Sequence, residues 1–397
     1  MDSDAYALWH TNTARHRSDV FVEYGGELYF AYYRSDEQLI IARSSDTIEW
    51  ELLDTGLTAN AEDPHNTPNI AIDGNGLIHV IWDVHSNSLR YATVGPGGTH
   101  IIDFLTGNNE SAVTYPSFFR LSDGDLLLLY RSGSSGNGDV IVKRYDTESG
   151  TWADMASPAI AGEGDRNPYW QAYLAPNDQL HLSWTWRERL PSNRGFESNR
   201  DLCFSRYSAK ENLWFDSTDN VAAPPVSASD CDLIAAVPAN STLANNTAIL
   251  VTAAGANVTA TFWRTATDNT PRIHLVHNSP DRRQWVVTPL NTRPMVTGLE
   301  SDGASLARPA LLEVNGQWGV FQRDSVASNR AYLDLIEPDT LSRTKRVYLS
   351  SGDMGLWEPH VTRFQGKIVV LMQQQNFRIE KGRSIQAATP LALAVLQ

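Results

Sequence analysis

Cysteine is scarce in this chain. Its 397 residues include only two cysteines, Cys203 and Cys231, which are too few for a disulfide-stapled scaffold. Long apolar runs are also missing, and without about eighteen consecutive apolar residues no membrane span is expected. The first residues, MDSDAYALWH, show neither a basic region nor an apolar stretch, so no signal peptide is visible.

Positive charge is in short supply. Lys and Arg number 32 against 46 Asp and Glu, giving a net charge of −14. This balance argues against nucleic acid as a partner, because phosphate binding needs a basic surface. Hydrophobic residues make up 42% and aromatic residues 10% of the chain, which indicates a folded protein rather than a disordered one.

Helical periodicity is absent, and a β-strand repeat takes its place. The repeated piece is a Gly/Asn/Asp turn followed by a strand of large apolar residues, and its copies are mostly about 50 residues apart, the length of a four-stranded propeller blade. We therefore predict an all-β fold: a single seven-bladed β-propeller domain covering residues 1–397. The seven copies are GGELYFAYYR, GNGLIHVIWDVH, SDGDLLLLYR, PNDQLHLSWTWR, GANVTATFWR, VNGQWGVFQR and FQGKIVVLMQ.

The N-terminal and C-terminal segments are predicted to close the propeller by pairing in one blade. The apolar tail LALAVL, residues 391–396, is a suitable strand for this closure, which hides a sheet edge. A proline often opens the first strand of a unit, a position where proline is tolerated. These prolines are Pro68, Pro116, Pro168, Pro309 and Pro359.

First strands of a propeller begin on the face where second strands end. This rule predicts that His65 and His85, twenty residues apart, meet at one rim, whereas mid-strand His79 is expected to be structural. The other predicted rim residues are Arg34, Asn66, Tyr115, Tyr130, Arg131, Arg166, Asn167, Arg187, Arg264 and Arg323.

The predicted rim is rich in Arg, His and Tyr and poor in Asp and Glu, a composition that suits an anionic ligand. Ordinary glycoside hydrolysis normally uses two carboxyl groups at the bond. The rim fits β-elimination on a uronic acid better, with His and Tyr transferring protons and a cation neutralising the carboxylate. Tyr130, beside Arg131 and facing His65 and His85, supplies these parts. A sialidase-like hydrolase of acidic sugars and a non-catalytic glycan-binding propeller remain alternatives.

Three stretches between residues 60 and 210 resemble a known family. DPHNTPNIAIDGNGLIHVIWDVHSNSLRY, TYPSFFRLSDGDLLLLYRSGSSGNGDVIVKRYD and RNPYWQAYLAPNDQLHLSWTWRE are similar to the BNR-repeat group that contains the propeller ulvan lyases. The resemblance implies a secreted or periplasmic lyase acting on a sulfated, uronate-containing polysaccharide. It implies catalytic roles for His65, His85, Tyr130 and, more weakly, Arg144. We expect substrate contacts from Asn66, Arg131, Arg166, Tyr169 and Arg187.

Two cysteines and a histidine provide a possible structural metal site. Cys203, Cys231 and His277 have suitable ligand atoms for tetrahedral zinc, although their spacing is not that of a zinc finger. A disulfide and two free thiols are the alternatives. We expect no organic cofactor, no membrane partner and a monomeric protein.

Overall fold

The computed structural model describes residues 1–16, 20–189, 195–278, 284–290, 307–324, 329–375, 378–380, 383–385 and 388–396. These residues form two compact units. The first comprises Met1–Gly133, Val140–Ser157 and Met354–Gln397, and the second comprises Ser134–Asp139 and Pro158–Asp353. The extent of the predicted single domain stays a prediction.

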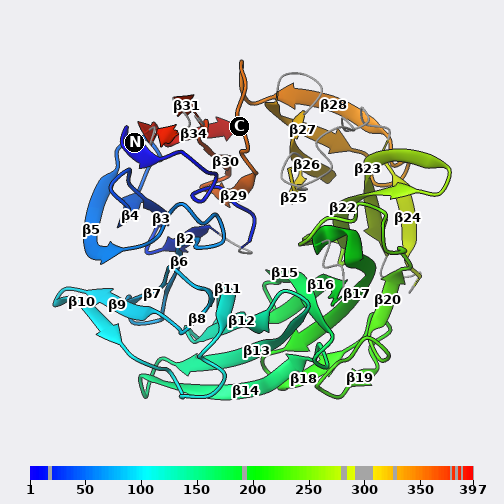
Figure 1. The fold of residues 1–397 in the computed structure, drawn as a ribbon, viewed down its shortest axis with the longest axis horizontal. Helices are drawn as coiled ribbons and strands as arrows, with labels where there is room; N and C mark the ends of the chain where they lie inside the picture. Colours follow the sequence, from blue (N-terminus) through cyan, green and yellow to red (C-terminus); the bar gives the residue numbers. More distant parts are fainter. Residues whose placement is uncertain are drawn as a thin grey trace. The chain divides into compact units, whose positions relative to one another are not determined.

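The first unit contains four of the predicted blades, each an antiparallel sheet (Figure 1). In each blade the strands follow the chain order, apart from β8, which leaves the second blade to join the third. The first blade is β2 (Phe21–Tyr24), β3 (Glu27–Tyr33), β4 (Gln38–Ser44) and β5 (Glu51–Thr58). The second is β6 (Asn69–Ile72), β7 (Ile78–Ile81), β9 (Tyr91–Gly95) and β10 (Gly98–Ile102). The third is β8 (His85–Asn87), β11 (Val113–Arg120), β12 (Leu126–Ser134), β13 (Asn137–Asp146) and β14 (Thr151–Ile160), of which short parts of β12, β13 and β14 belong to the second unit. The last is β29 (His360–Phe364), β30 (Lys367–Met372) and β34 (Ala392–Leu396).

The second unit contains the other three blades. One is β15 (Arg166–Leu174), β16 (Gln179–Glu188), β17 (Asn199–Ser208), β18 (Leu213–Phe215) and β19 (Val221–Ala222), with β20 (Asp232–Ala235) also paired to β17. The next is β21 (Ala248–Val251), β22 (Asn257–Thr265), β23 (Asp268–His277) and β24 (Val286–Pro289). The third is β25 (Ala310–Val314), β26 (Gln317–Asp324), β27 (Arg330–Ile336) and β28 (Arg343–Tyr348). The predicted all-β, seven-bladed propeller fold is confirmed.

Tight turns join the first and second strands where the sequence predicts them. Gly76 and Gly124 have φ values of +85° and +93°, a left-handed conformation that glycine adopts without strain. A Cβ on Gly124 would lie 2.7 Å from the Cα of Gly74, so the turns of two neighbouring blades approach closely there. The backbone bond from Gly74 N to Gly124 O, 2.9 Å long, fixes that approach.

The two ends of the chain pair within the first unit. Strand β34 pairs with β30, so the apolar tail forms a strand of the last blade, and closure of the propeller by both chain ends in one blade stays a prediction. Strand β1 (Ala5–Tyr6) pairs with β33 (Ala388–Thr389), and β31 (Arg378–Glu380) with β32 (Arg383–Ile385). The helical segment in the described part is one 3₁₀ turn, Gly195–Ser198. No described helix is long and apolar enough to cross a membrane.

Apolar faces of adjacent blades form the core. In one cluster of the first unit, Tyr33 and Ile41 of the first blade lie with Ile72 and Val80 of the second. All four are at most 2% exposed. Since burial of such a side chain contributes about 1.5–3 kcal/mol, these contacts stabilise the packing of the first blade against the second.

Candidate active site

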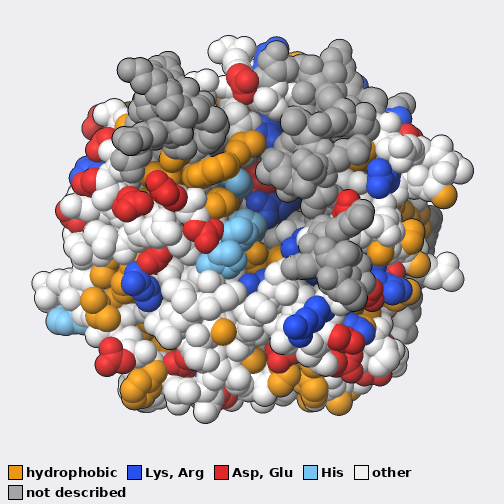
Figure 2. All heavy atoms as spheres, in the orientation of Figure 1, with side chains coloured by type: hydrophobic (Ala, Val, Ile, Leu, Met, Phe, Trp, Pro, Cys, Tyr) orange, Lys and Arg blue, Asp and Glu red, His pale blue; other side chains and the backbone are white. Residues whose placement is uncertain are grey.

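His65 and His85 meet, as the strand rule predicts. Their rings stack with centroids 4.1 Å apart and an interplanar angle of 21°. Both side chains are about one-third exposed, at 32% and 34%, so solvent reaches them. Figure 2 shows histidine side chains gathered on one face of the molecule.

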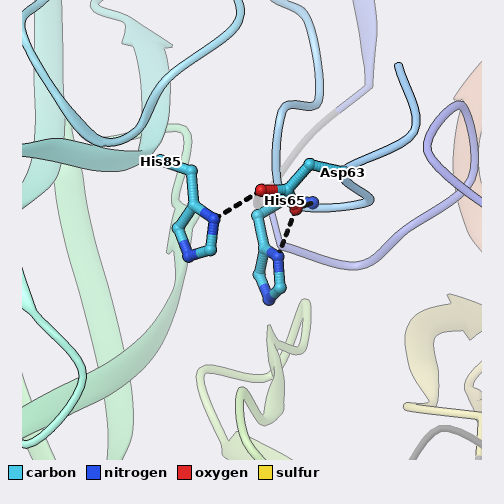
Figure 3. A group of neighbouring side chains, drawn as sticks. All are labelled: Asp63, His65 and His85. Carbon is cyan, nitrogen blue, oxygen red and sulfur yellow. Dashed lines mark hydrogen bonds and ion pairs between the residues drawn. The ribbon is translucent and has the colours of Figure 1, made fainter. Parts of the chain in front are cut away.

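Asp63 joins the two histidines, and the sequence reasoning missed it. Its Oδ1 is 2.6 Å from Nδ1 of His65, and its Oδ2 is 2.6 Å from Nδ1 of His85 (Figure 3). Burial alone would raise the pKa of Asp63, but hydrogen bonds from both histidine side chains and from the His65 backbone hold it well below its usual value. An ionised carboxylate only accepts hydrogen bonds, so both Nδ1 atoms carry protons. Each imidazole therefore directs Nε2 away from Asp63.

The loop that carries Asp63 and His65 is held by short-range hydrogen bonds. His65 N donates to Asp63 Oδ1 at 2.9 Å, and Asn66 N donates to the Asp63 carbonyl at 3.0 Å. The Asn66 amide donates to Asp83 Oδ1 at 2.8 Å and to the Asn60 carbonyl at 3.0 Å. Asn66 is only 6% exposed and braces the loop, and its predicted role as a substrate contact stays a prediction.

An edge strand places His85. Strand β8 pairs with β11, where His85 lies opposite Thr114. The turn before it requires positive φ at Asp83 (54°), and Ser86 within the strand also has positive φ (57°). Ser86 N donates to Thr114 Oγ1 at 2.8 Å. This departure from the second blade brings His85 next to the start of the third.

Two more rings extend the histidine pair into a column. His16 stacks on His65 at 4.7 Å between centroids, and Tyr115 stacks on His16 at 4.9 Å. Tyr115 also lies 6.1 Å from the His65 ring. His16 is only 6% exposed. Its segment is held in place by the backbone N–H of Arg15, which donates to Glu358 Oε2 at 2.7 Å. Nothing in the local sequence around His16 signalled this contact.

A β-bulge turns Tyr115 toward the histidines. Thr114 pairs with Arg131 and Ser117 with Leu129, so Tyr115 and Pro116 together oppose a single residue of β12. Bulges of this kind re-aim side chains beside functional sites. Tyr115 has φ of +56°, a costly conformation for an aromatic residue. The Arg131 guanidinium lies 4.9 Å from the ring of Tyr115.

The expectation that Tyr130 faces the histidine pair is wrong. Tyr130 is the residue opposite the bulge, it is 0% exposed, and it packs in the core between the second and third blades. Its hydroxyl donates to the Asn108 carbonyl at 3.4 Å. Burial, followed by the charges of Glu110 and Asp154, raises the pKa of Tyr130 far above its usual value. The hydroxyl is thus kept protonated in its buried site.

Arg144, which the resemblance places among the catalytic residues, lies away from the histidine pair. Its guanidinium pairs with Asp123 at 2.7 Å and Asp125 at 2.8 Å, both in the hairpin turn between β11 and β12. The end of β13 lies beside the start of β12, because the strands are antiparallel. Arg144 therefore belongs to the turn end of the blade, whereas His85 pairs at the opposite end of β11.

Arg131 is buried beside the site and forms hydrogen bonds with its supporting residues. It is 1% exposed, and its Nη2 donates to Thr114 Oγ1 at 3.0 Å and to Ser86 Oγ at 3.2 Å. Its guanidinium also lies near the Tyr115 ring, and its predicted role as a substrate contact stays a prediction. The histidine His79, predicted to be structural, is 0% exposed with Nδ1 2.6 Å from the Tyr91 hydroxyl.

The remaining predicted contacts lie in the second unit. Arg187 is 8% exposed and stacks over the Tyr169 ring, and its Nη1 donates to the Tyr169 hydroxyl at 2.8 Å. Its other nitrogens bind Asn199 and Asn245. Arg166 pairs with Asp165 at 3.0 Å and with Glu163 at 3.6 Å. Arg166, Tyr169 and Arg187 all have protein partners, and their predicted substrate role stays a prediction.

The predicted thiolate zinc site is wrong. Cys203 and Cys231 are joined in a disulfide, the alternative left open from the sequence, so neither sulfur is a thiolate ligand. The Trp186 indole N–H donates to Cys203 Sγ at 3.3 Å. His277 lies on another blade, with its ring 5.0 Å from Trp318. Among the described residues, the group suited to a metal ion is Asp63, His65 and His85, whose ligand atoms lie within 4.8 Å of one another.

Comparison with known proteins agrees with the blade repeat. Residues 27–293 match the model of the BNR repeat-containing family. The chain belongs to this family. Among curated proteins, it is 29% identical over 152 residues to the long isoform of ulvan lyase from Glaciecola sp. (strain KUL10), covering 27% of this chain and 15% of that protein. It is 22% identical over 208 residues to the short isoform from Alteromonas sp. (strain LOR), covering 38% of this chain and 39% of that protein. The matches thus span well under half of these relatives' own lengths.

Solved structures share the fold of this family member over its whole length. The polysaccharide lyase Uly1 has a TM-score of 0.72 at 17% identity, with 100% of this chain and 93% of that chain covered. An ulvan lyase of family PL25, described as bound to -[GlcA(1-4)Rha3S]-, has a TM-score of 0.71 at 14% identity, covering 100% and 95%. At these identities the likeness shows the seven-bladed fold.

Proposed function

We propose that this protein is a polysaccharide lyase that cleaves an ulvan-like, uronate-containing polymer by β-elimination. The observation that carries the proposal is the pair of exposed imidazoles, His65 and His85, held by one carboxylate with both Nε2 atoms directed outward. The similarity to ulvan lyases in sequence and fold supports the choice of substrate class. A secreted location follows from a polymeric substrate of this kind.

His65 acts as the base. Asp63 fixes the tautomer with the proton on Nδ1, so the lone pair on Nε2 accepts the C5 proton of the uronate. The electron pair of the broken C–H bond forms the C4–C5 double bond, and the C4–O bond breaks. A proton donor must then protonate the departing oxygen.

His85 and Tyr115 take the other two roles. A protonated His85 keeps its Nδ1–H bond to Asp63 and donates Nε2–H to the uronate carboxylate, where charge develops. Tyr115, whose ring is 6.1 Å from that of His65, donates the proton to the leaving oxygen. The Arg131 guanidinium near the ring stabilises the resulting phenolate.

Two tyrosine-to-phenylalanine variants test the assignment as a matched pair. Both hydroxyls are on buried tyrosines of neighbouring strands, but only Tyr115 touches the ring column. Since acid–base groups contribute roughly 10²–10⁴-fold, Tyr115→Phe should lower kcat on ulvan at least a hundredfold, and Tyr130→Phe by less than about threefold. The ultraviolet absorbance of the unsaturated uronate product gives the rate.

Three results would contradict the proposal. An inactive Tyr130→Phe beside an active Tyr115→Phe would reverse the tyrosine assignment. Cleavage without an unsaturated product, detected by mass analysis, would indicate a hydrolase. Binding of ulvan with no cleavage at all would indicate a glycan-binding module.

A further inference from the structure

We infer that Asp63, His65 and His85 form a binding site for a divalent transition-metal ion such as Zn²⁺, and that the bound ion switches the site off. The three side chains offer one carboxylate and two imidazoles, with ligand atoms within 4.8 Å of one another. Imidazole and carboxylate together suit Zn²⁺, Ni²⁺ and Cu²⁺ better than Ca²⁺ or Mg²⁺, which prefer all-oxygen sites.

The geometry lets an ion replace the two bridging protons. Each Asp63 oxygen is 2.6 Å from one Nδ1 atom, so a single ion between the carboxylate and the two rings can approach both Nδ1 atoms and one carboxylate oxygen (Figure 3). Zinc bonds of about 2.0–2.2 Å to nitrogen and oxygen need only small side-chain shifts from this arrangement.

The ion can reach the group from solvent. The three side chains are 29–34% exposed, unlike a structural metal site enclosed on all sides. Three protein ligands leave at least one coordination position for water. The column behind them, His16 and Tyr115, supports the His65 ring from its other face.

Other strong ligands do not compete within the described part. Both cysteines are in a disulfide, so no thiolate is present. All ten histidines of the chain are described, and most of those outside this group are nearly or fully buried. His100, on β10, is exposed and stands apart from the group, which makes it the matched control for binding by a lone imidazole.

Ion binding changes the tautomer of both histidines. A neutral imidazole that binds a metal through Nδ1 must carry its proton on Nε2, so the Nδ1 proton moves to Nε2 as the ion enters. Nε2 then donates instead of accepting. His65 loses the lone pair that the proposed function requires, and only this inhibitory consequence rests on that function.

Titration of the chelator-treated, dialysed protein with zinc chloride, followed by calorimetry, tests the site. We expect one ion per chain, and at least tenfold weaker binding of calcium. Asp63→Asn and His85→Gln should each weaken zinc binding roughly tenfold or more, and His100→Gln should change it less than twofold. Circular dichroism checks that each variant is folded. If Asp63→Asn is not folded, the zinc affinity of His85→Gln alone decides the test.

No zinc binding to the unaltered protein would overturn the inference, as would equal binding by His85→Gln. Ulvan cleavage measured at each zinc concentration should fall in proportion to site occupancy. Zinc binding without any cleavage by the metal-free protein would leave the ion site standing and remove the lyase. Cleavage that zinc at saturating occupancy does not slow would remove the inhibitory part of the inference.

Discussion

Asp63 has the greatest influence of any single residue at the site, because both histidines depend on it. Its two oxygens each accept a hydrogen bond from an Nδ1 atom, which fixes two tautomers at once. An amide in its place keeps the size and one acceptor oxygen, but its NH₂ group favours the opposite tautomer of one histidine.

Asp63→Asn should therefore lower kcat on ulvan by roughly 10²–10⁴-fold with a smaller change in KM. Steady-state rates from product absorbance measure this, with the exposed His100→Gln as a control for general effects. A variant that keeps the normal kcat would show that the tautomers are fixed by other contacts.

At the scale of elements, two irregular features build the site: edge strand β8 and the bulge in β11. A third element, the loop before β11, accepts the hydrogen bond of the Tyr130 hydroxyl through the Asn108 carbonyl. Lys143 of β13 is 0% exposed, and its Nζ lies 3.1 Å from Glu110, 2.5 Å from Asp154 and 3.1 Å from the Asn108 carbonyl. The buried Lys143 ammonium group thus stabilises the loop whose Asn108 carbonyl contacts the Tyr130 hydroxyl.

Lys143→Met removes the cation and leaves Glu110, 8% exposed, in a buried place without its ion-pair partner. Loss of one partner of a buried ion pair typically costs about 3–5 kcal/mol, so the free energy of unfolding should fall by that amount. Urea denaturation measures it. Arg43→Met, which breaks an exposed pair with Glu51, is the control and should cost less than about 1 kcal/mol. Equal losses in the two variants would contradict a special role for Lys143.

At the scale of the whole molecule, buried histidines in both units make stability depend on pH. Burial lowers the pKa of His79 to about 4, although Asp73 opposes the change, and it lowers the pKa values of His181 and His274 to about 4 as well. An unfolded histidine titrates near 6.5. The free energy of unfolding is therefore highest, as far as these histidines are concerned, above pH 6.5. It falls as the pH drops toward 4, because the histidines of the unfolded chain take up protons before those of the folded protein.

His79→Gln should flatten this dependence. A shift from 6.5 to about 4 corresponds to about 3 kcal/mol between pH 7 and pH 4, and the variant should lose that much less stability over this range. Urea unfolding at several pH values gives the slope, with His100→Gln as the exposed comparison. A slope equal to that of the unaltered protein would mean that His79 does not titrate in this range.

The sequence alone determined the blades and the meeting of His65 with His85. Turn residues and alternating apolar positions repeat locally, and a strand's direction fixes which rim its end reaches. Only the tertiary structure decided which tyrosine joins the histidines, because one extra residue in β11 re-aims Tyr115 while Tyr130 turns into the core. The same holds for the carboxylate between the rings, for Arg144 at the far end of its blade, and for the joined cysteines. These placements depend on strand register and on contacts between blades, and no short stretch of sequence encodes either.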